Sequence, residues 1–458
     1  MFDTSRLMIS VSGLRGRVGD GLTPEVVSRY AAAFGAYVRN ETGKRTVVLG
    51  RDSRVSGPMF ARAATAALES VGCEVVDVGI APTPTVQLAV EDAEAAGGLV
   101  VTASHNPVEW NALKFIGPTG TFLDAKETAA MHALLEGDRD VARVQWKEIG
   151  SYREDEGAID RHLERILDIP FLDREAIRQR AFTVALDCVR GAGGTIFPQL
   201  LEALGCTVHG INMEPDGLFP RAPEPVKANL AELEALVREK GADIGLATDP
   251  DSDRLVLVDE KGEAVGEDYT LALAATLVLR HRKGPVVTNL STSRLMDDVA
   301  ERAGVPLMRS AVGEINVARR MQAENAIVGG EGNGGVILPD VHLGRDAPVG
   351  AALVLQLMAE TGLPISRLVE SLGSYAIVKE KVERPQGSLD EAYALLEREL
   401  DAPGVDRQDG LRLDWPEEKR WVHLRPSGTE PIVRIIAEAA TREEATSLVE
   451  RIRSELPE

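Results

Sequence analysis

The chain has 458 residues, enough for about three or four domains, since a domain commonly holds about 150 residues. Hydrophobic residues make up 44% of it and charged residues 27%, as in ordinary globular proteins. The formal net charge of −21 argues against nucleic acid or an anionic membrane as the main partner. A phosphorylated ligand would therefore need local basic pockets.

The three cysteines, Cys73, Cys188 and Cys206, lie far apart and form no CxxC pair, which argues against a disulfide framework or a zinc site. The first residues contain no continuous apolar core of the signal-peptide kind. The longest apolar stretch, at 269–279, is too short to span a bilayer. We expect a soluble cytoplasmic protein.

Three segments, beginning at Thr46, Thr183 and Pro285, follow the same pattern. Each has a β-branched strand, a turn rich in Gly, Ser or Asp, an amphipathic helix ended by Gly, and a second short strand. This pattern predicts a βαβ crossover and therefore parallel strands. Three copies in series predict three related α/β domains.

The C-terminal part is different. A helix follows a segment rich in Pro and Gly, and two strand-like runs then flank a tight turn before a charged helix from Thr441. This pattern predicts a smaller α+β domain. We predict α/β domains at 1–150, 151–256 and 257–370 and the α+β domain at 371–458.

The segment 102–107, TASHNP, follows an apolar strand at 99–101. Ser104 stands at the end of this strand on a loop that Pro107 makes rigid, so its hydroxyl can project into a cleft. His105 and Asn106 could supply acid–base and hydrogen-bonding groups. Taken alone, the segment fits a turn that merely ends the strand at least as well.

An acidic loop follows a second apolar strand. Asp249, Asp251 and Asp253 are spaced two residues apart, and three carboxylates so close repel one another unless a cation neutralises them. Oxygen ligands suit a hard ion such as Mg²⁺. An EF-hand is excluded, because Arg254 stands where that loop needs Gly. Pro250 and Arg254 favour a shaped site over a solvated acidic turn.

The segment 328–340 places Glu331 and Asn333 among five glycines. Glycines allow the backbone to approach a ligand closely, and an acceptor beside an amide suits hydroxyl-rich ligands such as sugars. A plain flexible turn has the same composition, and composition alone does not separate the two.

The segment 424–435 predicts an anion site. It combines a basic side chain, two hydroxyls and a glycine, with a second arginine one strand away: Arg425, Ser427, Gly428, Thr429 and Arg434. A structural turn with an exposed arginine is the alternative. The four loops fall one in each predicted domain, which indicates an enzyme that grips a phosphorylated, hydroxyl-rich ligand.

The motifs SGLRG, TASHNP, NALKF, DPDSDR, GEGNGG and RPSGTEP occur in this order along the whole chain. In this the chain resembles the α-D-phosphohexomutase superfamily. The resemblance implies four domains around a central cleft, three of them mixed α/β. It implies that Ser104 carries a phosphoryl group, and that Mg²⁺ is bound by Asp249, Asp251, Asp253 and an oxygen of the phosphorylated Ser104.

The same resemblance implies further roles. Arg15 would lie beside the serine, and Lys114 would act as an acid–base group with a pKa lowered by nearby cations or by burial. His105 is a secondary candidate for hydrogen bonding or proton transfer. The expected substrate-binding residues are Arg254, Glu331, Asn333, Arg425, Ser427, Gly428, Thr429 and Arg434.

Two features bear on the sugar. Many members of the superfamily have Glu-x-Ser-Gly-His in the sugar loop, whereas Asn333, Gly334 and Gly335 end it here. The segment 312–318 resembles the corresponding loop of phosphoglucosamine mutases. We therefore favour conversion of glucosamine 6-phosphate to glucosamine 1-phosphate through a 1,6-bisphosphate.

A phosphomannomutase/phosphoglucomutase is the alternative within the superfamily. A sugar-phosphate phosphatase and a non-catalytic sugar-phosphate sensor are the alternatives from other classes. The favoured interpretation implies Mg²⁺ as cofactor, and glucose 1,6-bisphosphate or the cognate sugar bisphosphate as activator. The expected partner is a phosphorylated hexose, and the expected assembly is a monomer or a homodimer.

Overall fold

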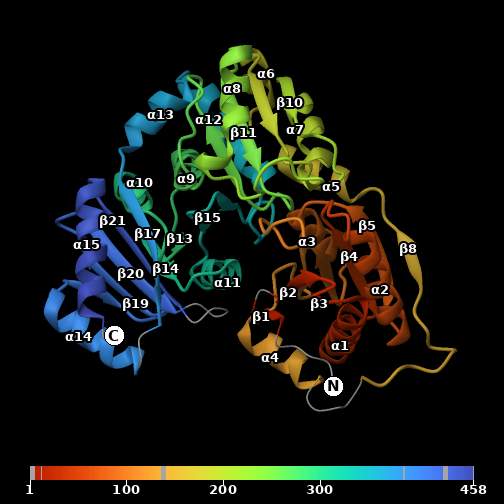
Figure 1. The fold of residues 1–458 in the computed structure, drawn as a ribbon. Helices are drawn as coiled ribbons and strands as arrows, with labels where there is room; N and C mark the ends of the chain where they lie inside the picture. The colour runs from red at the N-terminus through yellow and green to blue at the C-terminus, as the bar shows by residue number, and fades with distance from the viewer. Residues whose placement is uncertain (1–5, 12, 136–140, 385–386, 427–431, 457–458) are drawn as a thin grey trace.

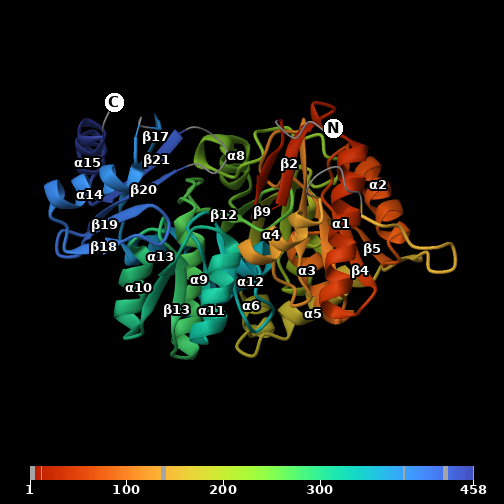
Figure 2. The same cartoon turned by 90° about the horizontal axis from the view of Figure 1, so that it is seen from below.

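The computed structural model describes residues 6–11, 13–135, 141–384, 387–426 and 432–456. Four sheets follow one another along the chain. Figures 1 and 2 show the first and the last of them at opposite ends of the molecule, with the other two between them. Chain order is therefore also the order in space.

The first sheet is mixed and has the order β1-β2-β7-β6-β4-β5-β8, with β3 pairing β2. Its strands are β1 (Met8–Ser10), β2 (Gly13–Val18), β3 (Gly21–Leu22), β4 (Thr46–Arg51), β5 (Glu74–Ile80), β6 (Gly97–Val101), β7 (Trp110–Ile116) and β8 (Tyr152–Glu154). Its helices are α1 (Pro24–Thr42), α2 (Gly57–Ser70), α3 (Thr83–Asp92) and α4 (Ala125–Ala133).

The second and third sheets have four strands each. The second contains β9 (Thr183–Asp187), β10 (Thr207–Ile211), β11 (Ile244–Thr248) and β12 (Leu255–Val258). The third contains β13 (Val286–Asn289), β14 (Leu307–Ser310), β15 (Val328–Glu331) and β16 (Gly335–Ile337).

The three sheets share one four-strand plan. Numbered along each unit, the strands lie in the order 2-1-3-4, as β5-β4-β6-β7, β10-β9-β11-β12 and β14-β13-β15-β16. The first three strands are parallel, and the fourth runs antiparallel to the third. This repetition confirms three related α/β domains.

The plan places three of the predicted loops at one topological position. The serine loop, the acidic loop and the glycine-rich loop each connect the third strand of a unit to its antiparallel fourth strand. In all three units the loop therefore begins at the carboxyl end of a parallel strand, where open α/β sheets commonly bind ligands.

Helices cover both faces of the first sheet, because neighbouring strand residues are apolar on both sides. Val47 and Leu49 of β4 pack in one core with α1, α2 and α4, whereas Val48 between them packs in another with α3. Such continuous apolar strands are typical of parallel sheets that are buried on both faces.

The second and third sheets share a hydrophobic core, whose buried residues lie between Leu163 and Leu372 and which Leu88 of α3 joins from the first domain. The helices of this region are α5 (Ala158–Leu167), α6 (Arg174–Arg180), α7 (Phe197–Ala203), α8 (Ala231–Lys240), α9 (Asp268–His281), α10 (Leu295–Ala303), α11 (Glu314–Glu324), α12 (Ala347–Thr361) and α13 (Ile365–Leu372), with 3₁₀ turns at Ala192–Thr195 and Lys227–Asn229. The second and third domains are therefore packed as one body.

The fourth sheet is antiparallel, in the order β17-β21-β20-β19-β18. It consists of β17 (Ala376–Glu383), β18 (Gly404–Asp406), β19 (Leu411–Trp415), β20 (Arg420–Pro426) and β21 (Ile432–Ala439), with helices α14 (Leu389–Leu400) and α15 (Arg442–Glu455). A separate hydrophobic core joins the sheet to both helices. This is the α+β architecture expected for the C-terminal domain.

The predicted limits near residues 150, 256 and 370 stay predictions. In the structure β12 pairs with β11, so the second sheet continues to Val258. Among the described residues no single helix is long and apolar enough to cross a membrane; α12 and α13 together pass by length and composition, but they are bent by 92° at the break between them.

Candidate active site

The serine loop and the acidic loop meet directly. The Ser104 Oγ donates a hydrogen bond to Asp249 Oδ2 at 2.7 Å, although the two residues are 145 positions apart in the chain. Ser104 is 5% exposed and adopts a φ of 49°, a left-handed conformation that is unusual for serine. The contact joins the first domain to the second through the hydroxyl predicted to carry phosphate.

An arginine that the sequence analysis did not single out holds this loop. Arg54 is fully buried, and its guanidinium donates to the carbonyl oxygens of Ser104 at 2.6 Å and of Asn106 at 2.7 Å. Its other terminal nitrogen donates to the carbonyls of Pro107 and Trp110. One side chain thus fixes four backbone positions of the loop.

Asp52 completes this support. Its Oδ2 accepts from Arg54 Nε at 3.0 Å and from the Thr102 hydroxyl at 2.6 Å, and Thr102 Oγ1 in turn accepts from the Ser104 amide. The only sequence signal was a polar GRDSR segment at the end of a predicted strand. Its contact with a loop 50 residues later depends on the pairing of β4 with β6.

The acidic loop is bound to the first domain at Asp251. The Lys114 Nζ donates to Asp251 Oδ2 at 2.6 Å and lies 3.4 Å from Asp253 Oδ2. The Thr83 hydroxyl donates to the same Asp251 oxygen at 2.7 Å. The structure therefore brings together Ser104, Lys114 and the three aspartates, as the motifs predict.

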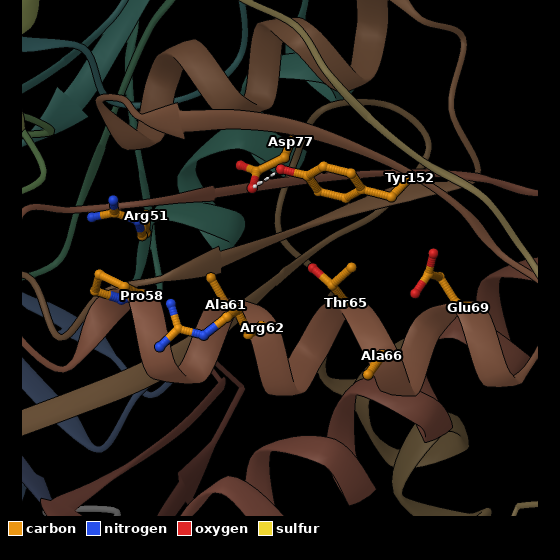
Figure 3. A pocket seen from close by; sticks show the side chains of 9 residues that line it. All are labelled: Arg51, Pro58, Ala61, Arg62, Thr65, Ala66, Glu69, Asp77 and Tyr152. Atoms are coloured by element: carbon orange, nitrogen blue, oxygen red, sulfur yellow. Dashed lines mark hydrogen bonds between the residues drawn. The ribbon is translucent and has the colours of Figure 1, made fainter.

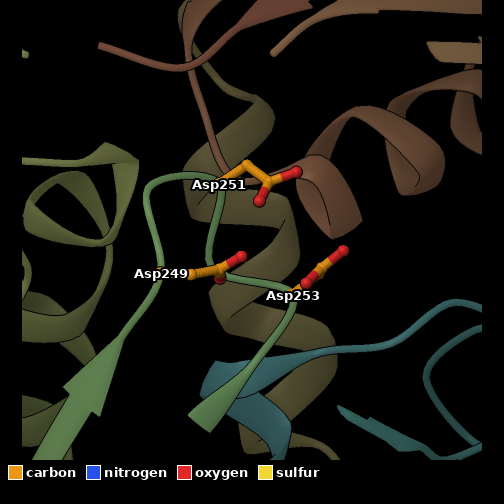
Figure 4. Close-up of side chains that lie close together, drawn as sticks. All are labelled: Asp249, Asp251 and Asp253. Atoms are coloured by element: carbon orange, nitrogen blue, oxygen red, sulfur yellow. The ribbon is translucent and has the colours of Figure 1, made fainter. Parts of the chain in front are cut away.

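The aspartate cluster suits a hard divalent cation. One oxygen from each of Asp249, Asp251 and Asp253 lies within 4.8 Å of the others, and Figure 4 shows the three carboxylates on the same side of the loop. Asp251 Oδ1 and Asp253 Oδ1 are buried and have no hydrogen-bond partner. Buried carboxylate oxygens without donors are costly, and an oxygen-coordinated cation would satisfy them.

Charge repulsion within the cluster agrees with this fit. Burial, followed by the Asp253 and Asp251 carboxylates, raises the pKa of Asp249 well above its usual value. Burial would also raise the pKa of Asp251, but the neighbouring Lys114 ammonium outweighs it and lowers that pKa. The raised pKa of Asp249 shows the repulsion that a further positive charge, such as a bound cation, would relieve.

One prediction about Lys114 is wrong. Burial would lower the pKa of its ammonium, but Asp251 and Asp253 outweigh burial and raise that pKa. The prediction of a lowered pKa assumed nearby cations or burial as the dominant influence. The fold instead places two carboxylates against this lysine.

His105 and Arg15 also contact the serine loop. The Nδ1 of His105 is 3.2 Å from the Ser104 Oγ, and Arg15 donates to Asn106 Oδ1 at 3.0 Å. The charge of Arg254, together with burial and Arg15, holds the pKa of His105 well below its usual value. Burial and the same Arg254 lower the pKa of Arg15. Two arginines thus make a positive corner beside the serine.

The glycine-rich loop places Glu331 in a crowded position. Its Oε1 accepts from Asn289 Nδ2 at 2.7 Å and from the Gly313 amide at 3.0 Å, and its Oε2 accepts from Arg345 Nη1 at 2.8 Å. A carboxylate offers about four acceptor positions. Asn333, two residues on, has a buried Oδ1 without a partner, which leaves that oxygen available to a ligand.

The segment 312–314 connects this loop to the fourth domain. The Val312 amide donates to Asp409 Oδ2 at 3.1 Å, and Asp409 also lies 3.0 Å from Arg425 Nε. The next amide, Gly313, is the one that donates to Glu331. The segment that resembles phosphoglucosamine mutases therefore lies between the predicted sugar and phosphate loops.

The predicted phosphate loop lies partly outside the described residues, since Ser427, Gly428 and Thr429 are not among them. Its flanking residues are described. Arg425 on β20 is directly opposite Arg434 on β21, which is directly opposite Lys381 on β17. Like charges opposed across strands repel one another, and a bound anion would relieve this repulsion.

A cavity of about 430 Å³ lies elsewhere, on the first domain, between α2 and the strands β5 and β8. Figure 3 shows Arg51 and Arg62 at one end of it and Tyr152, hydrogen-bonded to Asp77, at the other. It contains none of the residues described above, so it is separate from the candidate active site.

Comparisons with known proteins agree with this geometry. Four models named phosphoglucomutase/phosphomannomutase match the chain, as alpha/beta/alpha domains I, II and III and as the C-terminal domain, at residues 6–141, 160–262, 266–375 and 377–455.

Related chains match over nearly their full length. A phosphoglucomutase/phosphomannomutase of Thermococcus kodakarensis is 41% identical over 443 residues, 96% of each chain. A probable phosphoglucosamine mutase of Methanopyrus kandleri is 38% identical over 441 residues, 95% of each chain. The crystal structure of a phosphoglucomutase/phosphomannomutase family protein from Burkholderia thailandensis has a TM-score of 0.85 at 26% identity, covering 99% of this chain and 97% of that one. The chain therefore belongs to the phosphoglucomutase/phosphomannomutase family and is a phosphohexomutase.

Proposed function

We propose that the protein moves a phosphoryl group between the 1- and 6-positions of a hexose phosphate through phosphorylated Ser104, with glucosamine 6-phosphate and glucosamine 1-phosphate as its best substrates. The observation that carries the mechanism is the 2.7 Å contact of the Ser104 hydroxyl with Asp249. It places the proposed phosphoryl donor against a loop that could hold a cation, and two domains contribute to it.

The reaction consists of two transfers. In the first, the Oγ–phosphorus bond of phosphorylated Ser104 breaks while the free sugar hydroxyl forms its own bond to phosphorus and loses its proton, giving the 1,6-bisphosphate. The bisphosphate then turns around, because its two phosphates lie at opposite ends of the sugar, and the other phosphate returns to Ser104. We propose that the hydroxyl proton passes to His105, whose lowered pKa leaves a neutral imidazole and whose Nδ1 is 3.2 Å from Oγ. Lys114, an ammonium held beside Asp251, would supply the proton that the departing Ser104 Oγ takes up, and the second transfer would reverse both movements.

Mg²⁺ is the cofactor proposed for the acidic loop. Asp249, Asp251 and Asp253 would hold it together with an oxygen of the phosphorylated serine, and its charge would stabilise the negative charge on the transferring group. Arg15 and Arg254, which form the positive corner, would face the same phosphoryl oxygens. Positioning and charge, more than covalent chemistry, would carry the transfer.

The substrate would be held at both ends. We propose that Glu331 and Asn333 contact sugar hydroxyls and that Arg425 and Arg434 attract the phosphate that is not reacting, with Ser427, Gly428 and Thr429 as further phosphate ligands. The cross-strand row of like charges on the fourth sheet supports this assignment. Two-ended recognition favours a mutase over a phosphatase or a sensor.

The preference for glucosamine phosphate rests on the segment 312–318 and on the relatives named probable phosphoglucosamine mutase. A glucose or mannose phosphate is the second candidate, because the relative from Thermococcus carries the name phosphoglucomutase/phosphomannomutase. The acidic background of the chain, with a net charge of −21, would not repel a protonated 2-amino group.

Mass spectrometry of the purified protein tests the donor. A phosphate on Ser104, absent from Ser104→Ala, and a mutase activity that glucose 1,6-bisphosphate stimulates are the expected results. A phosphorylated serine with phosphate release and no stimulation would indicate a phosphatase. A Ser104→Ala protein that keeps substantial turnover would remove Ser104 as the donor.

A comparison of kcat/KM for the 1-phosphates of glucosamine, glucose and mannose tests the sugar. Glucosamine 1-phosphate should have the highest value, with glucose 1-phosphate measurable and lower. A tenfold preference for glucose or mannose phosphate would replace the favoured substrate and leave the phosphohexomutase assignment in place.

A further inference from the structure

Arg345 has no role in the mechanism above, yet it lies at the centre of the site. It is 7% exposed and stands between β16 and α12, where it contacts three carboxylates. Nη2 donates to Asp253 Oδ2 at 2.6 Å, Nη1 to Glu331 Oε2 at 2.8 Å and Nε to Glu314 Oε2 at 3.0 Å. It therefore connects the acidic loop of the second domain to the sugar loop of the third.

The three contacts need the shape of a guanidinium. Each uses a different nitrogen of one planar group, whereas the single ammonium of a lysine could not reach three separated carboxylates with this geometry. Glu314 is itself held by the first domain, because Gln87 Nε2 donates to its other oxygen at 3.1 Å. All of these side chains are buried. The cluster is therefore anchored from three domains.

The sugar loop leaves room for this arginine. A Cβ at Gly335 would lie 2.2 Å from Arg345 Cδ and 2.9 Å from its Cγ. Gly335 is the position at which many superfamily members have the histidine of Glu-x-Ser-Gly-His. In this chain the arginine fills the space that a side chain at 335 would take.

Arg345 also determines how Asp253 is presented. It binds Oδ2 at 2.6 Å, closer than Lys114 at 3.4 Å, and leaves Oδ1 buried without a hydrogen-bond donor, with Arg254 Nε 3.7 Å away. Lys114 and Thr83 do the same at Asp251, where both bind Oδ2 and Oδ1 is left without a donor. In each case a cation from outside the acidic loop engages one oxygen and leaves the other for the proposed cation site.

We propose that Arg345 is a positioning residue that couples the metal loop to the sugar loop. It orients Asp253 so that one oxygen faces the cation, and the same guanidinium holds Glu331 in place for the sugar. The proposal rests on the metal and sugar roles proposed above. Outer partners of metal ligands typically affect metal affinity about 10- to 100-fold, which sets the expected size of the effect.

Calorimetric titration of Mg²⁺ into the wild type, Arg345→Gln and Arg345→Lys, without sugar, tests the first half. Both variants should bind Mg²⁺ about 10- to 100-fold more weakly, because Asp253 loses its orientation. If Arg345 only competed with the metal by charge, the neutral variant would bind Mg²⁺ more tightly. Unchanged or tighter binding in Arg345→Gln would overturn the proposal.

Titration of glucose 1,6-bisphosphate into the same proteins without metal tests the second half. Both variants should bind this probe more weakly than the wild type, since Glu331 Oε2 loses the Arg345 guanidinium that holds it. A loss of Mg²⁺ affinity with unchanged bisphosphate affinity would limit Arg345 to the metal loop and remove the coupling. A wild type that binds no Mg²⁺ would instead contradict the proposed function.

Two further variants act as controls. Arg282→Gln removes an arginine that pairs with Asp340 at the surface of the third domain, and the affinities for Mg²⁺ and for the bisphosphate should stay within about twofold of the wild type.

Glu314→Gln removes the charge of only one anchor of Arg345 and leaves a side chain of the same size, so it should weaken Mg²⁺ binding by less than Arg345→Gln. If the Arg345 variants do not fold, Glu314→Gln decides: Mg²⁺ affinity equal to the wild type would then count against the proposal.

Discussion

At the scale of single residues, the site depends on contacts between positions distant in the chain. The resemblance grouped Ser104, Lys114 and the three aspartates as one site. Ser104 and the aspartates follow strand ends, where the sequence shows distinctive polar loops, whereas Lys114 lies within β7 and was assigned only through its motif. They did not reveal Arg54, whose acceptors are backbone carbonyls that no motif displays. The pKa of Lys114 was predicted in the wrong direction, because it depends on charges that only the fold brings near.

Arg54→Met should leave the serine loop without its support. Four carbonyls lose a charged donor and Asp52 loses its buried partner, so the thermal unfolding midpoint should fall, and kcat should drop by about 100-fold as the serine moves. Arg54→Lys keeps the charge and should recover stability more than kcat. Arg62→Met, an exposed arginine on the same domain, is the control. If kcat in Arg54→Met stayed within a factor of three, the loop would not depend on this arginine.

At the scale of elements, the sequence predicted the three βαβ units, because strand, helix and glycine stop each leave a local pattern. The sequence did not show that the serine loop, the acidic loop and the glycine-rich loop occupy the same position in their three units. It depends on the order of strands in each sheet and on the antiparallel fourth strand, which are decided by pairing between distant segments. The acidic loop also packs against the turn after β9: the Ala192 amide donates to the Pro250 carbonyl at 2.7 Å.

Gly191→Ala should displace the acidic loop from this turn. A Cβ at Gly191 would lie 2.6 Å from Pro250 Cα and 2.7 Å from its carbonyl oxygen, and a backbone neighbour cannot give way without moving the loop. Mg²⁺ affinity in calorimetry and kcat should both fall, kcat by about tenfold or more. Gly57→Ala is the matched control. The nearest atom to a Cβ at Gly57 is Cδ of the flexible Arg51 side chain, 3.3 Å away, so Mg²⁺ affinity and kcat should both remain near the wild-type values. Equal behaviour of the two variants would contradict this account of the turn.

At the scale of the whole molecule, buried polar contacts connect the domains. His162 on α5 and His342 both contact Asp346 Oδ2, at 2.7 and 3.0 Å, and Thr85 of the first domain contacts the other side of His162 at 2.8 Å. Asp346 also caps α12 by accepting from the Val349 amide. The sequence predicted four domains in series but not this cluster, because its members come from separate segments that are individually unremarkable.

Asp346 should make the thermal stability of the protein depend on pH in the acidic range. Burial would raise its pKa, but His162 and the hydrogen bonds from both histidines outweigh burial and lower that pKa. A group whose pKa is lowered in the folded state contributes stability above its unfolded pKa, about 3.9 for aspartate, and that stability is lost as the pH falls below this value.

Asp346→Asn keeps an oxygen that can cap α12 but has no carboxylate charge. The wild type should therefore unfold at a higher temperature than Asp346→Asn at pH 5, and this difference should shrink by pH 3, by about 1 kcal/mol per pH unit below pH 4. Carboxylates distant from Asp346 titrate alike in both proteins, so the comparison isolates Asp346 together with the two histidines that it contacts. A difference in midpoint that is constant or grows between pH 5 and pH 3 would show that Asp346 does not stabilise the molecule through its charge.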